Sequence, residues 1–232
     1  MAKRRIGILT SGGDCPGLNA TIRGAAKACY SMFGEDNVEI VGISNGFHGL
    51  IHNNCRIMKP EDFSGILTRG GTILGTSRQA FKLMRVPDKD GLDKVAAMKH
   101  TYHKLSLDCL VILGGNGTHK TANLLREEGL NVVTLPKTID NDLIHTDHTP
   151  GFGSAARYVA STVREITIDA NVYEKKSVTI IEIMGRHAGW LTAASALARK
   201  YTGDNPLLIY LPETAFDQEE FLKAVENSFE KN

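Results

Sequence analysis

The chain contains 232 residues, 42% of them hydrophobic, which is enough apolar side chain to fill one large domain or two lobes. Its 27 Lys and Arg nearly balance its 26 Asp and Glu, so the net charge of +1 gives no overall attraction for nucleic acid or an anionic membrane. Any anionic ligand must therefore be held by a local site. The four cysteines show no CxxC spacing, and no apolar run resembles a signal segment or a membrane span, so we expect a protein of the reducing cytoplasm.

Apolar runs alternate with helix-like segments along the chain. The strand-like runs are 5–9, 38–43, 108–113, 131–135 and 177–183, and the helix-like segments are 21–30, 119–128 and 190–200. This alternation is typical of an α/β fold with largely parallel sheets and flanking helices. The turn-rich segment HTDHTPGFG (145–153) predicts a boundary between a lobe of residues 1–150 and a second lobe of residues 151–232.

Four loops that follow expected strands carry most of the functional information. They are TSGGDCPGLN (10–19), GGNGTHKT (114–121), PKTIDND (136–142) and MGRHAG (184–189). In open α/β sheets, ligands bind at the carboxyl ends of the strands, where loop amides and helix N-termini point at the crevice. We therefore expect the ligand site to be built from these loops.

Glycine pairs in the first two loops favour phosphate binding, because glycine lets the backbone approach a bulky anion without a Cβ in the way. A tight turn that needs positive φ is the alternative for either loop taken alone. The repeated arrangement, with Thr118 placed as a helix N-cap, favours phosphate. No glycine precedes Lys120, so this is not a Walker A loop, and no GxGxxG with a trailing acid is present. Both observations argue against a P-loop NTPase and a dehydrogenase.

The loop PKTIDND carries two carboxylates two residues apart. Because side chains alternate along an extended segment, we expect Asp140 and Asp142 on the same side. Such a pair suits phosphoryl transfer, since Asp140 can accept a hydroxyl proton while Asp142 helps to hold Mg²⁺ near the phosphates. An Asx turn, in which the aspartates cap backbone amides, is the alternative, although Lys137 beside them favours an anion site.

Two arginines follow glycine-rich strand exits. Arg186 in MGRHAG and Arg78 in GGTILGTSRQAF could each grip a phosphate through the planar guanidinium group, or could simply be solvated. The histidines include two HxxH pairs, His100 with His103 and His145 with His148. Neither pair has further ligands at zinc spacing, so solvated or hydrogen-bonded histidine is the better interpretation.

Read together, five motifs resemble the phosphofructokinase family over essentially the whole chain: TSGGDCPGLNATIRG, GGTILGTSR, GGNGT, PKTIDND and MGRHAG. The resemblance implies two Rossmann-like α/β lobes. It also implies phosphoryl transfer with Mg²⁺, from ATP or pyrophosphate, to the 1-hydroxyl of fructose 6-phosphate in glycolysis. The implied enzyme is cytoplasmic and allosteric, and it forms homodimers or homotetramers with sites shared between subunits.

The resemblance assigns site residues by motif position. The positions that match the phosphoryl-donor site are Gly13, Arg78, Gly115, Asn116, Gly117 and Thr118, with Lys137 beside them. The positions that match the catalytic and sugar-phosphate site are Thr138, Asp140, Asp142, Met184, Gly185 and Arg186. In this assignment Asp140 is the general base, and Arg186 also steadies the transferring group. Asn116 and Asp142 are the candidate Mg²⁺ ligands.

Asn116 bears on magnesium binding, and Gly117 and Lys137 bear on the choice of donor. ATP-dependent bacterial members of the family usually carry aspartate where this chain has Asn116, a poorer ligand for Mg²⁺. Pyrophosphate-using members usually carry aspartate at the position of Gly117, so Gly117 favours ATP. Lys137 points the other way, because pyrophosphate enzymes have lysine there. The combination of Gly117 and Lys137 is similar to that of a smaller set of ATP-using relatives, so we expect ATP, with pyrophosphate as the alternative.

Two further departures bear on whether the site is complete. Ser177 stands where many members place an arginine that reaches the substrate phosphate of a neighbouring subunit, a role that Lys175 or Lys176 could take. The chain also ends before the family's usual C-terminus, so we expect the second lobe to be incomplete. A non-catalytic subunit that binds nucleotide or sugar phosphate would fit these departures, whereas the aspartate pair argues for catalysis. An NAD kinase is a further alternative, against which MGRHAG and PKTIDND count.

Overall fold

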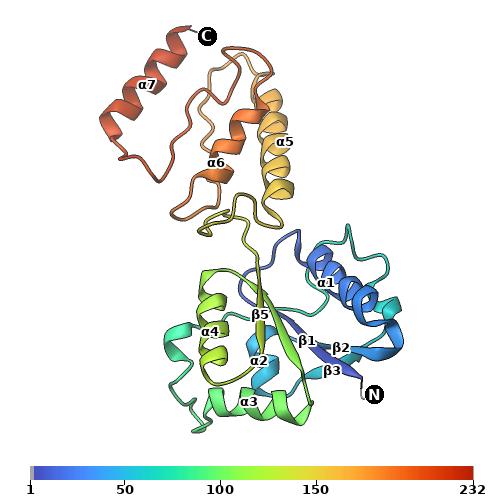
Figure 1. Cartoon of the computed structure of the whole chain (residues 1–232). Helices are drawn as coiled ribbons and strands as arrows, with labels where there is room; N and C mark the ends of the chain where they lie inside the picture. The colour runs from blue at the N-terminus through green and yellow to red at the C-terminus, as the bar shows by residue number, and fades with distance from the viewer. Residues whose placement is uncertain (1–2, 232) are drawn as a thin grey trace. The chain divides into compact units, whose positions relative to one another are not determined.

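The structure is a computed structural model that describes residues 3–231, and the chain divides into two compact units (Figure 1). The first unit runs to Thr138 and also contains Thr149–Gly151. The second unit comprises Ile139–His148 and the chain from Phe152 onward. A lobe boundary between residues 150 and 151 stays a prediction.

A five-stranded, mostly parallel sheet organises the first unit (Figure 1). Its strands, in the spatial order β3-β2-β1-β4-β5, are β1 (Arg4–Thr10), β2 (Val38–Ile43), β3 (Cys55–Met58), β4 (Cys109–Gly114) and β5 (Val132–Pro136). The edge strand β3 is antiparallel to β2. Strand β1 pairs with β2 on one side and with β4 on the other. The carboxyl ends of β1 and β4 therefore form a topological switch point, where open α/β sheets bind ligands.

The central strands form because their apolar residues are buried on both faces of the sheet. Leu9 and Ile43 belong to a core cluster that includes residues of three helices: α2 (Gly46–Ile51), α3 (Lys94–Lys104) and α4 (Asn116–Glu127). Ile8 and Ile40 point to the opposite face and are also fully buried. The central strands are thus covered by packed side chains on both sides, and their carboxyl ends are left for a ligand.

Helix α1 (Leu18–Phe33) follows β1 and packs beside β2, apart from α2, α3 and α4 (Figure 1). Its buried residues Leu18, Ile22 and Ala26 recur every four positions and form one apolar stripe. Asn19, in the first turn, is also buried. Because α1 starts at the carboxyl end of β1, this buried polar side chain lies at the ligand end of the sheet.

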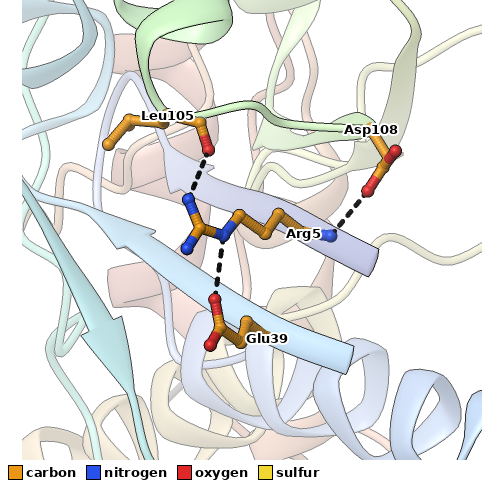
Figure 2. A network of polar contacts seen from close by, with 4 residues as sticks. All are labelled: Arg5, Glu39, Leu105 and Asp108. Atoms are coloured by element: carbon orange, nitrogen blue, oxygen red, sulfur yellow. Dashed lines mark hydrogen bonds and ion pairs between the residues drawn. The ribbon is translucent and has the colours of Figure 1, made fainter. Parts of the chain in front are cut away.

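Arg5 braces the opposite end of the sheet, as Figure 2 shows. Its Nε donates to the Glu39 carboxylate on β2 at 2.9 Å, and its Nη1 donates to the Leu105 carbonyl at 3.1 Å. Its backbone amide donates to the Asp108 carboxylate at 2.7 Å. These bonds tie the start of β1 to β2 and to the connection between α3 and β4.

The second unit is mainly helical and irregular in the part that the structure describes. Its α-helices are α5 (Phe152–Ala170), α6 (Trp190–Ala194) and α7 (Gln218–Lys231). The prediction of a strand at 177–183 is wrong: the segment is irregular, and Val178 and Ile180 are exposed. A strand is held by hydrogen bonds to a neighbouring strand, and no strand is described in this unit.

Among the described helices of both units, none has the length and apolar character needed to cross a bilayer.

Candidate active site

The loop after β1 (residues 11–17, the β1 loop) brings backbone rather than side chains to the ligand end of the sheet. Gly12 has φ +90°, a conformation that residues with a Cβ rarely adopt. Its amide donates to the Ser77 carbonyl at 3.1 Å. A Cβ at Gly12 would lie 3.7 Å from Thr118 Oγ1 and 3.8 Å from Lys137 Nζ. The β1 loop therefore lies close to the start of α4 and to the end of β5.

Helix α4 begins directly after β4, with Gly115 as its N-cap. The prediction that Thr118 caps this helix is wrong, because Thr118 lies inside the first turn, where it is buried beside Gly114. Asn116 and Gly117 are exposed at the helix N-terminus, where backbone amides and the helix dipole favour an anion. A Cβ at Gly117 would meet no atom within 4 Å, so the space beside it is open.

Lys137 follows β5 and connects the ends of three strands. It is only 5% exposed. Its backbone amide donates to the Gly114 carbonyl at 2.9 Å, and its ammonium group donates to the Gly13 carbonyl in the β1 loop. The side chain thus holds a positive charge at the carboxyl ends of β1, β4 and β5, where it favours an anionic ligand.

Arg78 brings a second cation to the β1 loop. Its Nη2 lies 3.4 Å from the place that a Cβ of Gly13 would occupy, so the glycine leaves room for the guanidinium group. Arg78 is exposed, whereas Lys137 is buried. Two cations, a glycine-rich backbone and the N-terminus of α4 therefore converge within the first unit. This combination of donors and positive charge suits the phosphate groups of a ligand.

Thr138 is held by a return segment of the chain. The buried Thr149 hydroxyl donates to the Thr138 carbonyl. Next to it, the Cys15 thiol donates to the Pro150 carbonyl at 3.3 Å, and a Cβ at Gly151 would lie 2.7 Å from Cys15 Sγ. Burial raises the pKa of the Cys15 thiol, so this thiol stays protonated at neutral pH. Cys15 therefore acts as a packed, neutral donor at the β1 loop.

The two aspartates of PKTIDND belong to the second unit, and their local geometry differs from the prediction. Asn141 between them has φ +54°, so the segment bends rather than running extended. The alternation that would place Asp140 and Asp142 on one side does not apply to this bend. Asparagine tolerates the left-handed conformation, and the buried Asn141 amide donates to the Asp147 carbonyl at 2.9 Å. Asp140 is half-buried and Asp142 is exposed.

Met184, Gly185 and Arg186 form a tight turn in the second unit, before α6. The buried Gly185 accepts a hydrogen bond from the Ala188 amide at 2.9 Å. A Cβ at Gly185 would lie 2.2 Å from the Ala188 carbonyl oxygen, so this turn requires glycine. Arg186 follows with φ +52°, and both Arg186 and Met184 are exposed. The turn thus leaves the guanidinium group at the surface, available to a ligand.

The predicted site residues are divided between the two units. The first contains Gly13, Arg78, Gly115, Asn116, Gly117, Thr118, Lys137 and Thr138, and the second contains Asp140, Asp142, Met184, Gly185 and Arg186. No group of three or more His, Cys, Asp or Glu residues that could hold a metal is found within 3–231. Mg²⁺ in phosphoryl-transfer sites takes one or two protein ligands plus substrate phosphates. Asn116 in the first unit and Asp142 in the second are each exposed, and an amide oxygen is a weaker ligand for Mg²⁺ than a carboxylate.

Sequence reasoning missed the residues that hold the backbone before Arg78. One of them is the buried Asn19, whose partners lie 50 to 54 residues further along the chain. A local pattern cannot reveal a contact at that separation. The one available signal is a polar residue inside the apolar stripe of a helix.

A family model described as Phosphofructokinase matches residues 5–232. The chain belongs to the phosphofructokinase family. An ATP-dependent 6-phosphofructokinase of Spirochaeta thermophila is 51% identical to it over 219 residues, which cover 93% of this chain. An ATP-dependent 6-phosphofructokinase of Propionibacterium freudenreichii is 43% identical over 221 residues, which cover 95% of this chain. The chain spans 57% and 56% of the length of these two relatives.

Solved phosphofructokinase structures share the fold. A pyrophosphate-dependent phosphofructokinase from Nitrosospira multiformis has a TM-score of 0.86 at 25% identity, covering 98% of this chain and 58% of that one. Phosphofructokinase from Pichia pastoris has a TM-score of 0.78 at 27% identity, covering 98% of this chain and 24% of that one. The predicted family and the predicted α/β fold are therefore confirmed.

Proposed function

We propose that this protein is an ATP-dependent 6-phosphofructokinase, which transfers the γ-phosphoryl group of ATP to the 1-hydroxyl of fructose 6-phosphate in glycolysis. The observation that carries the proposal is the convergence of Arg78, Lys137 and the α4 N-terminus on the β1 loop. Such a site supplies the donors and positive charge that a polyphosphate requires. The two relatives described above, both named ATP-dependent 6-phosphofructokinase, support the same donor and reaction.

Gly117 supports a nucleotide as the donor. A Cβ at this exposed residue would meet no atom within 4 Å, and we assign the α-phosphate of ATP to the space beside it. An aspartate here would add a carboxylate next to that phosphate and repel it. We expect Gly117→Asp to raise the KM for ATP by about tenfold or more, a cost that like charges readily impose. An unchanged KM would contradict the assignment of ATP to this space.

In the proposed reaction, Asp140 accepts the proton of the sugar 1-hydroxyl. The freed oxygen bonds to the γ-phosphorus, and the bond from that phosphorus to its bridging oxygen breaks, so ADP leaves. Thr138 lies beside Asp140 in sequence and is assigned to the same step. Arg186 stabilises the transferring charge, and with Met184 and Gly185 it binds the sugar phosphate.

Mg²⁺, when bound by Asn116, Asp142 and the donor phosphates, would neutralise charge on the β- and γ-phosphoryl oxygens. Asn116 contributes a neutral amide, so more of the ion's protein ligation falls to the Asp142 carboxylate. Lys137 and Arg78 add fixed positive charge on the donor side. The chain thus provides cations for the phosphates and a carboxylate for the proton.

Replacing Asp140 tests the reaction directly. Asp140→Asn removes the general base and should lower kcat by about 10² to 10⁴. Asp147→Asn changes an exposed aspartate a few residues away and serves as the matched control, with kcat close to the parent value. Formation of fructose 1,6-bisphosphate is followed for each purified variant with ATP and Mg²⁺. Activity of Asp140→Asn within a few-fold of the parent would refute the assignment.

Pyrophosphate is the second candidate donor. Buried Lys137, with its ammonium group on the Gly13 carbonyl, provides a fixed charge close to where a short phosphate donor would lie. The Nitrosospira multiformis structure, titled pyrophosphate-dependent, has the same fold. Parallel assays with ATP and with pyrophosphate separate the two donors. Product with pyrophosphate alone would overturn the preferred one.

We include in the proposal that the protein is a homodimer or homotetramer, because the family resemblance implies sites shared between subunits. The same resemblance implies a cytoplasmic enzyme under allosteric control. The near-zero net charge supports neither nucleic acid nor a membrane as partner. Light scattering after size-exclusion chromatography measures the assembly. If the measured molar mass at assay concentration is that of a single chain and the protein is fully active, the proposal that subunits share active sites is contradicted.

A further inference from the structure

Residues 69–78 (the Arg78 segment) bring Arg78 to the β1 loop without helix or strand of their own. An irregular segment lacks the repeating backbone bonds of regular structure, so its position depends on the groups that bind its backbone. In the first unit these groups come from the end of β1, the β1 loop, the first turn of α1 and Asn45, whose amide donates to the Leu74 carbonyl at 2.8 Å. They explain how an exposed arginine is delivered to a defined place.

Asn19 makes three hydrogen bonds to the Arg78 segment. Its Nδ2 donates to the Arg69 carbonyl at 2.9 Å and to the Gly71 carbonyl at 2.7 Å. Its Oδ1 accepts from the Ile73 amide at 2.9 Å. The side chain is 1% exposed, so no solvent competes for these bonds. One side chain therefore fixes the backbone at three alternate residues.

Only one orientation of the Asn19 amide satisfies these partners. With oxygen and nitrogen exchanged, the oxygen would face two backbone carbonyls and the NH₂ group would face the Ile73 amide. The site thus requires two donors and one acceptor in a fixed arrangement. An aspartate has the same shape but supplies acceptors only, so it would repel Arg69 and Gly71.

Thr10 makes a second set of bonds, to the middle of the Arg78 segment. Its hydroxyl donates to the Gly75 carbonyl at 2.7 Å. Thr72 Oγ1 lies 3.0 Å from Thr10 Oγ1 and must be the donor of that pair, because the Thr10 proton is already used. Thr72 Oγ1 in turn accepts from the Leu74 amide at 3.3 Å. These hydrogen bonds, the hydroxyl relay, fix residues 72–75 of the segment and reach Gly75, which is closer along the chain to Arg78 than any residue that Asn19 binds.

The β1 loop completes the attachment. The Asp14 carboxylate accepts from the Thr72 amide at 3.0 Å. The Thr76 hydroxyl donates to the Gly12 carbonyl at 2.7 Å, and the Gly12 amide donates to the Ser77 carbonyl at 3.1 Å. The residues immediately before Arg78 are thus bound to the same loop that its guanidinium group approaches.

We propose that Asn19 is a positioning residue for the phosphoryl donor, which sets the place of the Arg78 guanidinium group beside Gly13 by fixing the Arg78 segment. This inference rests on the proposed function, which assigns Arg78 to donor binding. Asn19 is too buried to touch a ligand, so it acts through Arg78. The residues proposed for the sugar phosphate, 184–186, belong to the other unit.

The test replaces Asn19 by Asp, which keeps the size of the side chain and the acceptor for Ile73 but removes both donors. We expect the KM for ATP with Mg²⁺ to rise about 10- to 100-fold, because small displacements of a binding group cost rates of this order. The KM for fructose 6-phosphate should stay within about twofold, since binding of the sugar phosphate does not use the Arg78 segment. Hydrogen exchange in peptides covering 70–78 should become faster, while exchange in β4 stays unchanged.

Asn131→Asp is the matched control. The Asn131 amide donates to the Asp108 carbonyl at 2.8 Å, just before β5 and far along the sheet from the β1 loop. The same substitution there removes the same kind of bond, and both KM values should stay at the parent level. If Asn19→Asp does not fold, Thr10→Val removes the hydroxyl relay with a residue of equal shape, and the same selective rise in the KM for ATP is expected.

The inference would be overturned if Asn19→Asp changed the KM for ATP and the KM for fructose 6-phosphate equally. It would also be overturned if the variant had a lower melting temperature but kept the parent's KM for ATP. Unchanged exchange in 70–78 would overturn it too. If the parent protein does not phosphorylate fructose 6-phosphate from ATP, the proposed function fails. In that case the exchange measurement alone decides whether Asn19 fixes the segment.

Discussion

Gly12 and Gly65 both adopt a left-handed backbone conformation, but only a Cβ at Gly12 would lie close to other residues. Gly12, at φ +90°, lies beside Thr118 and Lys137, whereas a Cβ at Gly65, at φ +70°, would meet no atom within 4 Å. Alanine is strained at either position, so each Gly→Ala variant should lose about 1 to 2 kcal/mol of unfolding free energy. Only Gly12→Ala should also raise the KM for ATP, since its methyl group would lie at the phosphate edge of the β1 loop.

Urea unfolding and steady-state kinetics of the two variants measure these effects separately. Gly65→Ala is the control for strain without a ligand. A similar rise in its KM for ATP would show that general destabilisation, not the place of Gly12, weakens donor binding.

The Cys55 thiol makes the free energy of unfolding depend on pH under alkaline conditions. Burial raises the pKa of this thiol to about 11 from an ordinary value of 9.0. Between these values the folded state keeps a proton that the unfolded state has lost. The unfolded state then binds fewer protons, so the unfolding free energy falls as the pH rises through this window. Urea unfolding at the two ends of this pH window measures the effect. We expect the unfolding free energy of Cys55→Ala to fall less across the window than that of the parent. An equal fall in both proteins would contradict the raised pKa.

At the scale of elements, the start of β1 is held by Arg5, which bonds β2 and the connection from α3 to β4. We expect Arg5→Met to lower the unfolding free energy by about 1 kcal/mol and to leave the KM for ATP unchanged, because the bonds lie at the opposite end of the sheet from the β1 loop. Arg56 is the control: its ion pair with Asp62 is more exposed, so Arg56→Met should cost less. A loss for Arg56→Met equal to that for Arg5→Met would contradict the bracing role.

The apolar pattern predicted β1, β2 and β4 because strands buried on both faces read as continuous apolar runs, and it also predicted the edge strand β5, although Val133 there is exposed. The run at 177–183 has the same pattern but forms no strand, since a pattern reports apolar character and not the presence of a neighbour to pair with. β3 was not predicted, because it is only four residues long and Arg56 interrupts its apolar character.

Part of the candidate site was also readable from the sequence. The glycines of the β1 loop and Lys137 were predicted at one edge of the sheet, and the structure brings them into contact. Asn19 and Thr10 could not be predicted, since their partners in the Arg78 segment are 50 to 65 residues away. The bend at Asn141 could not be predicted either, because asparagine adopts both extended and left-handed backbone.

At the scale of the molecule, the two units differ in how their backbone is protected. In the first, β1 is paired along both edges, and Ile8 and Leu9 are fully buried. In the second, 177–183 has no strand pairing and residues 177–182 are exposed. We expect amides of β1 to exchange far more slowly than those of 177–183 in native-state hydrogen exchange. Protection in 177–183 equal to that of β1 would mean that this run pairs with a strand outside the described fold.

The central place of β1 has a consequence for biosynthesis. Strand β1 precedes β4 by about a hundred residues, so its second edge stays unpaired until β4 has been made, with Ile6 opposite Cys109. Translation takes about 5 to 20 s to reach that partner, at about 5 to 20 residues per second for about a hundred residues. Throughout that interval the nascent chain presents an apolar strand with an open edge, which other unfinished chains can join. We therefore expect the unpaired edge of β1 to be a site of association between unfinished chains until β4 covers it.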